Sequence, residues 1–129
     1  MTYLICKKFT FEASHKLWDN LLSNEANFER FGKCANPPSH GHSYKVFVYL
    51  KSKKLKNGMV RNFSELKEVF NKRIYNKYDH QFLNLIINKL TTAENLAEEI
   101  YKVIKRDFKE LWKIRVYETE TNYAEYWEE

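Results

Sequence analysis

The strongest constraint on the fold is the stretch of residues 40–50, where aliphatic side chains alternate with others directly after a His-Gly-His sequence. Every second residue of a β-strand lies on the same face of its sheet. We therefore predict a strand with His40 and His42 on the same face as the aliphatic row from Val46 to Leu50. Two imidazoles so placed can bind one metal ion, and Gly41 between them lets the backbone come close. The alternative is a pair of half-buried histidines without a ligand.

A second alternating run, from Leu4 to Ala13, predicts another strand with Phe9, Phe11 and Ala13 on its apolar face. His15 continues this parity, so we expect it to point inward. A buried imidazole needs a partner, because an unpaired buried polar group is costly. That partner is either a hydrogen-bonding group or a metal ion.

Three inward imidazoles, those of His15, His40 and His42, form a set of ligands with a fourth position open. This arrangement is typical of catalytic zinc, whereas structural zinc sites usually close with four protein ligands. Cys34 lies six residues before His40. It is either the fourth ligand or a separate base.

The remaining chain predicts two helices and a closing hairpin. Residues 17–39 form a long irregular connection, and residues 59–63 are expected to pair back on the strand that precedes them. Capping patterns at Asn62 and Thr91 begin two helices with apolar stripes. Ile114 to Glu118 and Tyr123 to Trp127 complete the sheet, so the sequence predicts an α+β fold.

Two further groups are candidate functional residues. Glu118 shares parity with buried aliphatic residues, and a carboxylate held in a pocket can bind a guanidinium-like edge through two hydrogen bonds. Asp79 precedes His80, and such a carboxylate can orient an imidazole or share a proton with it.

Composition limits the class of protein. The 129 residues of the chain are expected to form a single domain, residues 1–129. The content of 43% hydrophobic and 16% aromatic residues excludes a disordered chain. No apolar run is long enough to span a membrane and no signal-peptide pattern is present, so we expect a cytoplasmic protein with reduced cysteines. The net charge of +5 suits an anionic ligand.

At this point the chain resembles the 6-pyruvoyl-tetrahydropterin synthase family, which includes the 6-carboxy-tetrahydropterin synthases of queuosine biosynthesis. Seven segments match the family in order: Phe11 to His15, Phe31 to Cys34, His40 to Tyr44, Gly58 to Val60, Asp79 to Leu83, Thr92 to Asn95 and Tyr117 to Thr119. The resemblance covers nearly the whole chain. It implies the T-fold, a four-stranded antiparallel sheet with two helices packed on one face. It also implies a homohexamer, a dimer of trimers with active sites at subunit interfaces.

Each site residue takes a role from the resemblance. The implied zinc ligands are His15, His40 and His42. The implied catalytic groups are the thiol of Cys34 and the pair Asp79 and His80, which relay its proton. The implied substrate-binding residues are Glu118, which holds the pterin ring, and Thr92 and Glu94, which line its pocket.

The implied enzyme is a carbon–oxygen lyase that acts on 7,8-dihydroneopterin triphosphate and expels triphosphate. We expect zinc as the cofactor and Cys34 as the base, with no nicotinamide, because no glycine-rich dinucleotide motif is present. Five residues separate Cys34 from His40, a spacing that resembles the pyruvoyl-forming members; the queuosine-type members more often have three. The product is therefore expected to be 6-pyruvoyl-tetrahydropterin, and the alternative is 6-carboxy-tetrahydropterin of the 7-deazaguanine pathway.

Two other classes of protein would also use these residues. A zinc hydrolase would use the three histidines with a bound hydroxide and would tolerate the loss of Cys34. A metal-stabilised nucleic-acid-binding module would use the lysine-rich loop from Lys51 to Lys56 and would bind with steep salt dependence. The hydrolase would also need a carboxylate base near the metal. The nucleic-acid-binding module leaves Glu118 and the Asp79–His80 pair without a task, and we expect no nucleic acid and no membrane as partners.

Overall fold

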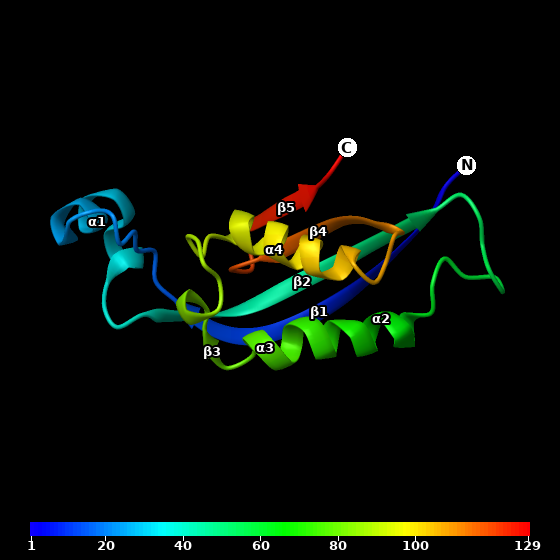
Figure 1. Ribbon diagram of the computed structural model, residues 1–129, viewed down its shortest axis with the longest axis horizontal. Helices are drawn as coiled ribbons and strands as arrows, with labels where there is room; N and C mark the ends of the chain where they lie inside the picture. The colour runs from blue at the N-terminus through cyan, green and yellow to red at the C-terminus, as the bar shows by residue number, and fades with distance from the viewer.

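The two predicted alternating runs form the longest strands of the protein. In the computed structural model, which describes residues 1–129, β1 (Tyr3–His15) and β2 (His40–Ser52) pair antiparallel over their whole length (Figure 1). The register places Ala13 opposite His42 and His15 opposite His40. The inward faces of both strands are buried, which confirms the parity predicted from the sequence.

Three shorter strands complete the sheet, whose order is β3-β1-β2-β4-β5. They are β3 (Gln81–Phe82), β4 (Leu111–Tyr117) and β5 (Tyr123–Trp127). The predicted closing hairpin is confirmed, since β4 and β5 pair antiparallel. The expected four-stranded antiparallel sheet needs a correction, because β3 adds a fifth strand that runs parallel to β1.

The prediction that residues 59–63 pair back on β2 is wrong. Both edges of β2 are already occupied, by β1 on one side and by β4 on the other. Met59 makes only an isolated bridge to Lys56, and Phe63 already begins a helix.

Two helical segments cover the same face of the sheet (Figure 1). The first begins after Asn62, whose side chain accepts the Ser64 N–H. It runs without a break through three parts, α2 (Phe63–Phe70), a π-helical turn (Asn71–Tyr75) and α3 (Asn76–Tyr78). The second is α4 (Ala93–Lys105). None of the helices is long and apolar enough to cross a membrane.

The connection of residues 17–39 is more regular than expected. It contains α1 (Asn24–Phe31), which is capped by the Ser23 side chain, and a 3₁₀ turn (Gly32–Ala35). Figure 1 shows this segment beyond the end of the sheet where β1 ends and β2 begins. The ring of Trp18 contacts Phe28 edge to face at 5.6 Å, so aromatic packing holds the segment together.

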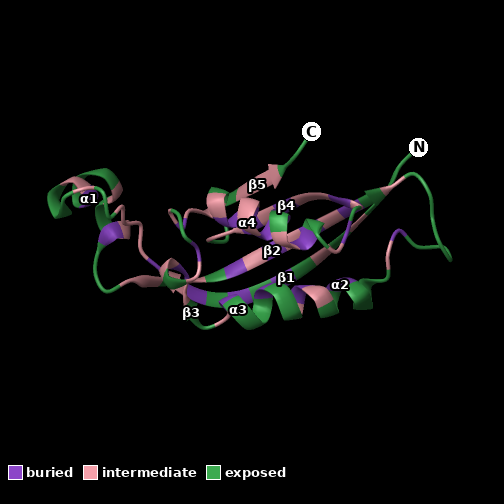
Figure 2. Ribbon diagram, viewed as in Figure 1, coloured by how far each residue is buried: buried purple, intermediate pink, exposed green.

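The core lies between the sheet and the two helical segments. Figure 2 shows buried residues where these layers face each other, and mainly exposed ones on α1 and on the loop of residues 53–62. Phe9 stacks on Phe70 with ring centroids 3.9 Å apart, and Phe11 meets Tyr78 at 5.7 Å. Burying such apolar surface is the main stabilising term of a domain of this size.

The sequence pattern suggested Thr91 as the N-cap of α4, but the structure shows that the cap is Thr92. The Thr92 hydroxyl accepts the Asn95 N–H at 3.2 Å.

A Thr92→Ala variant should lower the free energy of unfolding by about 1 kcal/mol, because one N–H of the first turn loses its partner. Thr92→Ser should keep most of this stability. Urea unfolding of the three proteins checks the prediction, and equal losses in both variants would contradict it.

Candidate active site

Three histidines gather at the end of the sheet where β1 ends and β2 begins. Their ligand atoms all lie within 4.8 Å of one another, and no other set of three or more histidine, cysteine or acidic side chains in the chain converges in this way. The strand register produces the cluster, since His15 lies opposite His40 while His42 lies one strand repeat further on the same face. The structure therefore brings together the three residues predicted to be metal ligands.

A hydrogen bond fixes the orientation of the His15 ring. Nδ1 of His15 lies 2.8 Å from the Thr91 carbonyl oxygen and 3.1 Å from the Thr91 hydroxyl. Because a carbonyl can only accept, Nδ1 carries the proton and Nε2 presents its lone pair. Burial, together with the neighbouring His40, lowers the pKa of His15 to about 4. The ring is therefore neutral at pH 7, which is the form that binds metals.

Two nitrogen atoms of the cluster fit a metal ion. Nε2 of His15 and Nε2 of His42 are both buried without a hydrogen-bond partner. Buried polar atoms in proteins almost always have a partner, so two such atoms in one cluster require an explanation. A cation bound by three imidazoles would satisfy both nitrogens and keep a coordination position open, which is the ligand set of catalytic zinc.

Glu118 follows β4 and lies beside the cluster. Its Oε1 atom is 3.2 Å from Nε2 of His42, although no hydrogen bond forms between them. Burial lowers the pKa of His42, and the negative charge of Glu118 opposes this shift. The inward orientation predicted for Glu118 is thus confirmed.

The other two predicted substrate-binding residues lie at the start of α4. Glu94 lines a pocket of about 430 Å³ together with Glu118. The Thr92 side chain does not line that pocket, because its hydroxyl caps the helix. The structure therefore brings Glu94 to Glu118 and gives Thr92 a local structural task.

Asp79 and His80 form a fixed pair after α3. Oδ2 of Asp79 accepts a hydrogen bond from Nδ1 of His80 at 2.7 Å, while Oδ1 accepts the Glu12 N–H at 2.9 Å. These bonds, the one from Glu12 first, lower the pKa of the Asp79 carboxyl group. His80 has a positive φ of 59° and its side chain is 78% exposed. The pair is thus anchored to β1 and presents its imidazole to the surface.

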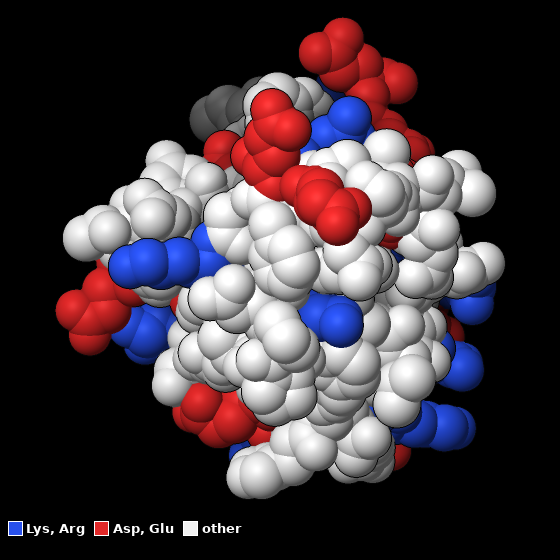
Figure 3. Space-filling model, turned by 90° about the vertical axis from the view of Figure 1, so that its left-hand side faces the viewer, with Lys and Arg blue, Asp and Glu red and all other residues white.

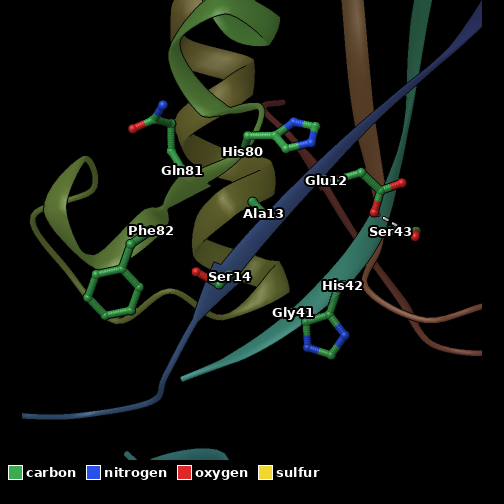
Figure 4. Close-up of a pocket in the computed structure, with 9 residues that line it drawn as sticks. All are labelled: Glu12, Ala13, Ser14, Gly41, His42, Ser43, His80, Gln81 and Phe82. Atoms are coloured by element: carbon green, nitrogen blue, oxygen red, sulfur yellow. Dashed lines mark hydrogen bonds between the residues drawn. The ribbon is translucent and has the colours of Figure 1, made fainter. Parts of the chain in front are cut away.

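His80 faces a surface pocket of about 600 Å³ (Figure 4). The pocket includes His42 of the histidine cluster, and Glu12 and Ser43, which share a hydrogen bond of 2.7 Å. His42 therefore connects the cluster with the pocket that the Asp79–His80 pair borders.

Cys34 lies in the 3₁₀ turn that follows α1. The Leu17 N–H donates to the Cys34 carbonyl at 2.8 Å, which ties this turn to the chain just after β1. The half-buried thiol is not part of the histidine cluster. It makes no hydrogen bond with Asp79 or His80 within one chain.

Two residues near the site have no role in the sequence-based assignment. Thr91 matched a capping pattern, but the structure makes it the partner of His15, 76 residues away. Tyr44 is fully buried beside His42 and its hydroxyl has no partner. No local sequence signal reveals either contact, because both depend on how distant strands and loops meet.

The surface around this end of the molecule carries little charge. Figure 3 shows it mainly uncharged, with a few lysines, arginines and acidic residues. The loop from Lys51 to Lys56 lies at the other end of β2, a distance of roughly 30 Å at the usual rise per strand residue. The lysine-rich loop is thus remote from the histidine cluster.

Comparison with known proteins gives consistent matches over the whole chain. The family model described as 6-pyruvoyl tetrahydropterin synthase matches residues 4–129. The human 6-pyruvoyl tetrahydrobiopterin synthase is 35% identical over 129 residues, which cover 95% of this chain and 89% of the human protein. The 6-carboxy-5,6,7,8-tetrahydropterin synthase of Haemophilus influenzae is 32% identical over 98% of this chain and 99% of its own length.

Solved structures agree with these matches. The 6-pyruvoyl tetrahydropterin synthase of Caenorhabditis elegans superimposes with a TM-score of 0.93 at 28% identity, covering 100% of this chain and 97% of its own. The Plasmodium vivax 6-pyruvoyl tetrahydropterin synthase, at 16% identity and a TM-score of 0.72 over 98% of this chain and 97% of its own, shares the fold. The expected T-fold is thus confirmed, and the chain belongs to the 6-pyruvoyl tetrahydropterin synthase family.

Proposed function

We propose that the protein is a zinc-dependent lyase that converts 7,8-dihydroneopterin triphosphate to 6-pyruvoyl-tetrahydropterin with elimination of triphosphate. The observation that carries the proposal is the cluster of His15, His40 and His42, with two unpartnered nitrogens beside the Glu118 carboxylate. A metal site next to an acidic group suits a ligand that offers hydroxyl oxygens and a ring with N–H donors.

Zinc held by the three histidines would act as a Lewis acid that makes the carbon–hydrogen bond beside a bound hydroxyl group more acidic. The protein must then supply a base, and the thiolate of Cys34 takes this role. Glu118 orients the substrate by accepting two hydrogen bonds from the pterin ring. Glu94 lines the same pocket and narrows the positions open to that ring.

Asp79 and His80 are proposed to exchange the proton with Cys34. Asp79 holds the His80 ring through Nδ1, so Nε2 is free to accept or donate a proton. The absence of a hydrogen bond between this pair and Cys34 within one chain supports an assembly in which neighbouring subunits complete each site. We therefore propose the homohexamer, a dimer of trimers, as the active form.

A second candidate differs only in the product. The identity of 32% to a 6-carboxy-tetrahydropterin synthase over nearly the whole chain favours it. The five residues between Cys34 and His40 favour the pyruvoyl product.

Mass analysis of the products from 7,8-dihydroneopterin triphosphate tests both candidates. We expect 6-pyruvoyl-tetrahydropterin and released triphosphate. A carboxy-pterin with acetaldehyde would place the protein in the queuosine branch. Unchanged substrate, with zinc bound and the protein folded, would contradict the proposed activity.

Removal of the metal should abolish turnover reversibly. A chelator strong enough to compete with three imidazoles is expected to reduce activity to background, and one equivalent of zinc should restore it. Circular dichroism before and after chelation provides the control for unfolding. Full turnover after the metal has been removed would contradict the zinc dependence.

A further inference from the structure

Tyr44 carries a buried hydroxyl that the structure leaves without a partner. Its ring stacks on Phe11 with centroids 5.1 Å apart and meets His42 edge to face at 5.5 Å. A phenylalanine would make the same ring contacts, so packing explains the ring but not the hydroxyl. Because a buried hydroxyl without a partner is unfavourable, we expect a partner in the functional state.

Three buried side-chain nitrogen or oxygen atoms of the protein lack a hydrogen-bond partner, and all three belong to the histidine cluster or to Tyr44 beside it. They are Nε2 of His15, Nε2 of His42 and the hydroxyl of Tyr44. A bound metal ion would satisfy the two nitrogens, because each offers a lone pair to the ion. The third atom carries a proton and needs an acceptor of its own.

Glu118 is an acceptor on the same face of the sheet. The antiparallel register pairs Lys45 with Tyr117, which places Tyr44 opposite Glu118 on the neighbouring strand. A phenol hydroxyl keeps its proton at physiological pH, so Tyr44 can donate a hydrogen bond to a carboxylate.

Metal binding would change what the carboxylate can pair with. Without a metal, Oε1 of Glu118 lies 3.2 Å from Nε2 of His42. A metal ligand offers its lone pair to the ion, so Nε2 of His42 would carry no proton to attract or bind the carboxylate. The Tyr44 hydroxyl, which has no partner in the metal-free protein, is then the buried donor on the side chain opposite Glu118.

We propose that Tyr44 is a positioning residue whose hydroxyl donates a hydrogen bond to Glu118 in the metal-loaded protein and so holds that carboxylate for the ligand. The inference rests on the proposed function, since that function assigns Glu118 to the pterin ring. Tyr44 thereby couples occupation of the histidine cluster to the orientation of the substrate-binding carboxylate.

A crystal structure of the zinc-loaded protein without pterin tests the contact itself. We expect the Tyr44 hydroxyl oxygen within about 3 Å of a Glu118 carboxylate oxygen. A Tyr44 hydroxyl that bonds to any other group, or to none, would overturn the proposal. This result does not depend on whether the protein acts on pterins.

Binding of neopterin, a fluorescent pterin, tests the consequence for the ligand. Tyr44→Phe should weaken neopterin binding to the zinc-loaded protein roughly tenfold, which is typical for losing a hydrogen bond to a charged group. The same substitution in a Glu118→Gln background should weaken it by less than about twofold, since the two side chains act as one unit. Equal losses in both backgrounds would mean that the hydroxyl acts independently of Glu118, and would overturn the proposal.

Two further readouts separate positioning from a structural role. The zinc affinity of Tyr44→Phe should stay within about threefold of wild type, because no ligand is lost. The metal-free variant should melt no lower than wild type, since the hydroxyl makes no bond there. Tyr101→Phe, on α4 and in contact with Tyr126, is the matched control with unchanged neopterin binding.

Failure of the proposed function gives a different result from failure of this inference. A wild-type protein that holds zinc but binds no neopterin would contradict the pterin assignment, while the zinc-loaded crystal structure still decides the contact. If wild type binds neopterin and Tyr44→Phe binds it with the same affinity, this inference is overturned while the pterin assignment stands.

Discussion

A His40→Ala variant is expected to bind zinc at least ~100-fold more weakly than wild type and to show no measurable turnover. Replacing a residue that merely orients a metal ligand already costs 10- to 100-fold in affinity, and removing a ligand should cost at least as much. The His40 side chain makes no hydrogen bond in the chain and is only half-buried, so its truncation should disturb the fold little. Competition with a zinc-binding dye measures the affinity directly.

The same variant should lose the stabilisation that zinc gives. A ligand at 100 times its dissociation constant adds about 2.7 kcal/mol to the free energy of unfolding. The melting temperature of wild type should therefore rise with zinc, while that of His40→Ala should stay constant. His80→Ala is the matched control, because that exposed imidazole lies outside the cluster and should leave zinc binding intact. Stoichiometric zinc in His40→Ala would contradict the assigned ligand set.

A Cys34→Ala variant should lose about 10²- to 10⁴-fold in turnover while it keeps its zinc. This range is typical of removing a general base that is positioned on the substrate. The thiol stands outside the group of atoms that cluster within 4.8 Å, so the metal should not depend on it. Steady-state kinetics and zinc content, measured on the same preparation, check both halves of the prediction.

Cys6 provides the matched control for that experiment. It is the other free cysteine, lies exposed on β1, and takes no part in the proposed site. Cys6→Ala should therefore keep both turnover and metal. Loss of zinc in Cys34→Ala would make Cys34 a ligand, and turnover within tenfold of wild type would exclude it as the base.

The sequence predicted the long strands because both are buried on one face only. A strand of this kind alternates for its entire length, and both runs, around Phe11 and around Val48, show an unbroken period of two. The two-residue strand β3 has no period to detect. Residues 59–63 contain apolar side chains, but Val60 is buried in the core and Phe63 starts a helix, so their pattern comes from packing and not from a strand.

The histidine cluster was predictable for the same reason, since parity alone assigns His15, His40 and His42 to one face. Their partners were not. Thr91 and Thr92 are adjacent, and the capping pattern indicated Thr91 although Thr92 caps the helix. Only the approach of the Thr91 segment to β1 shows that Thr91 binds His15. The unpartnered hydroxyl of Tyr44 likewise appears only when its surroundings are known.

The pairing of β1 with β2 has a consequence for how the chain folds. A slip of one residue would turn the apolar face outward and is strongly disfavoured. A slip of two residues would keep every apolar side chain on the correct face, so hydrophobic burial discriminates against it only weakly. Such a slip would, however, move His15 away from its position opposite His40 and break up the ligand set. A metal ion bound by the three histidines during folding would then stabilise the native register of β1 and β2 over the register shifted by two residues.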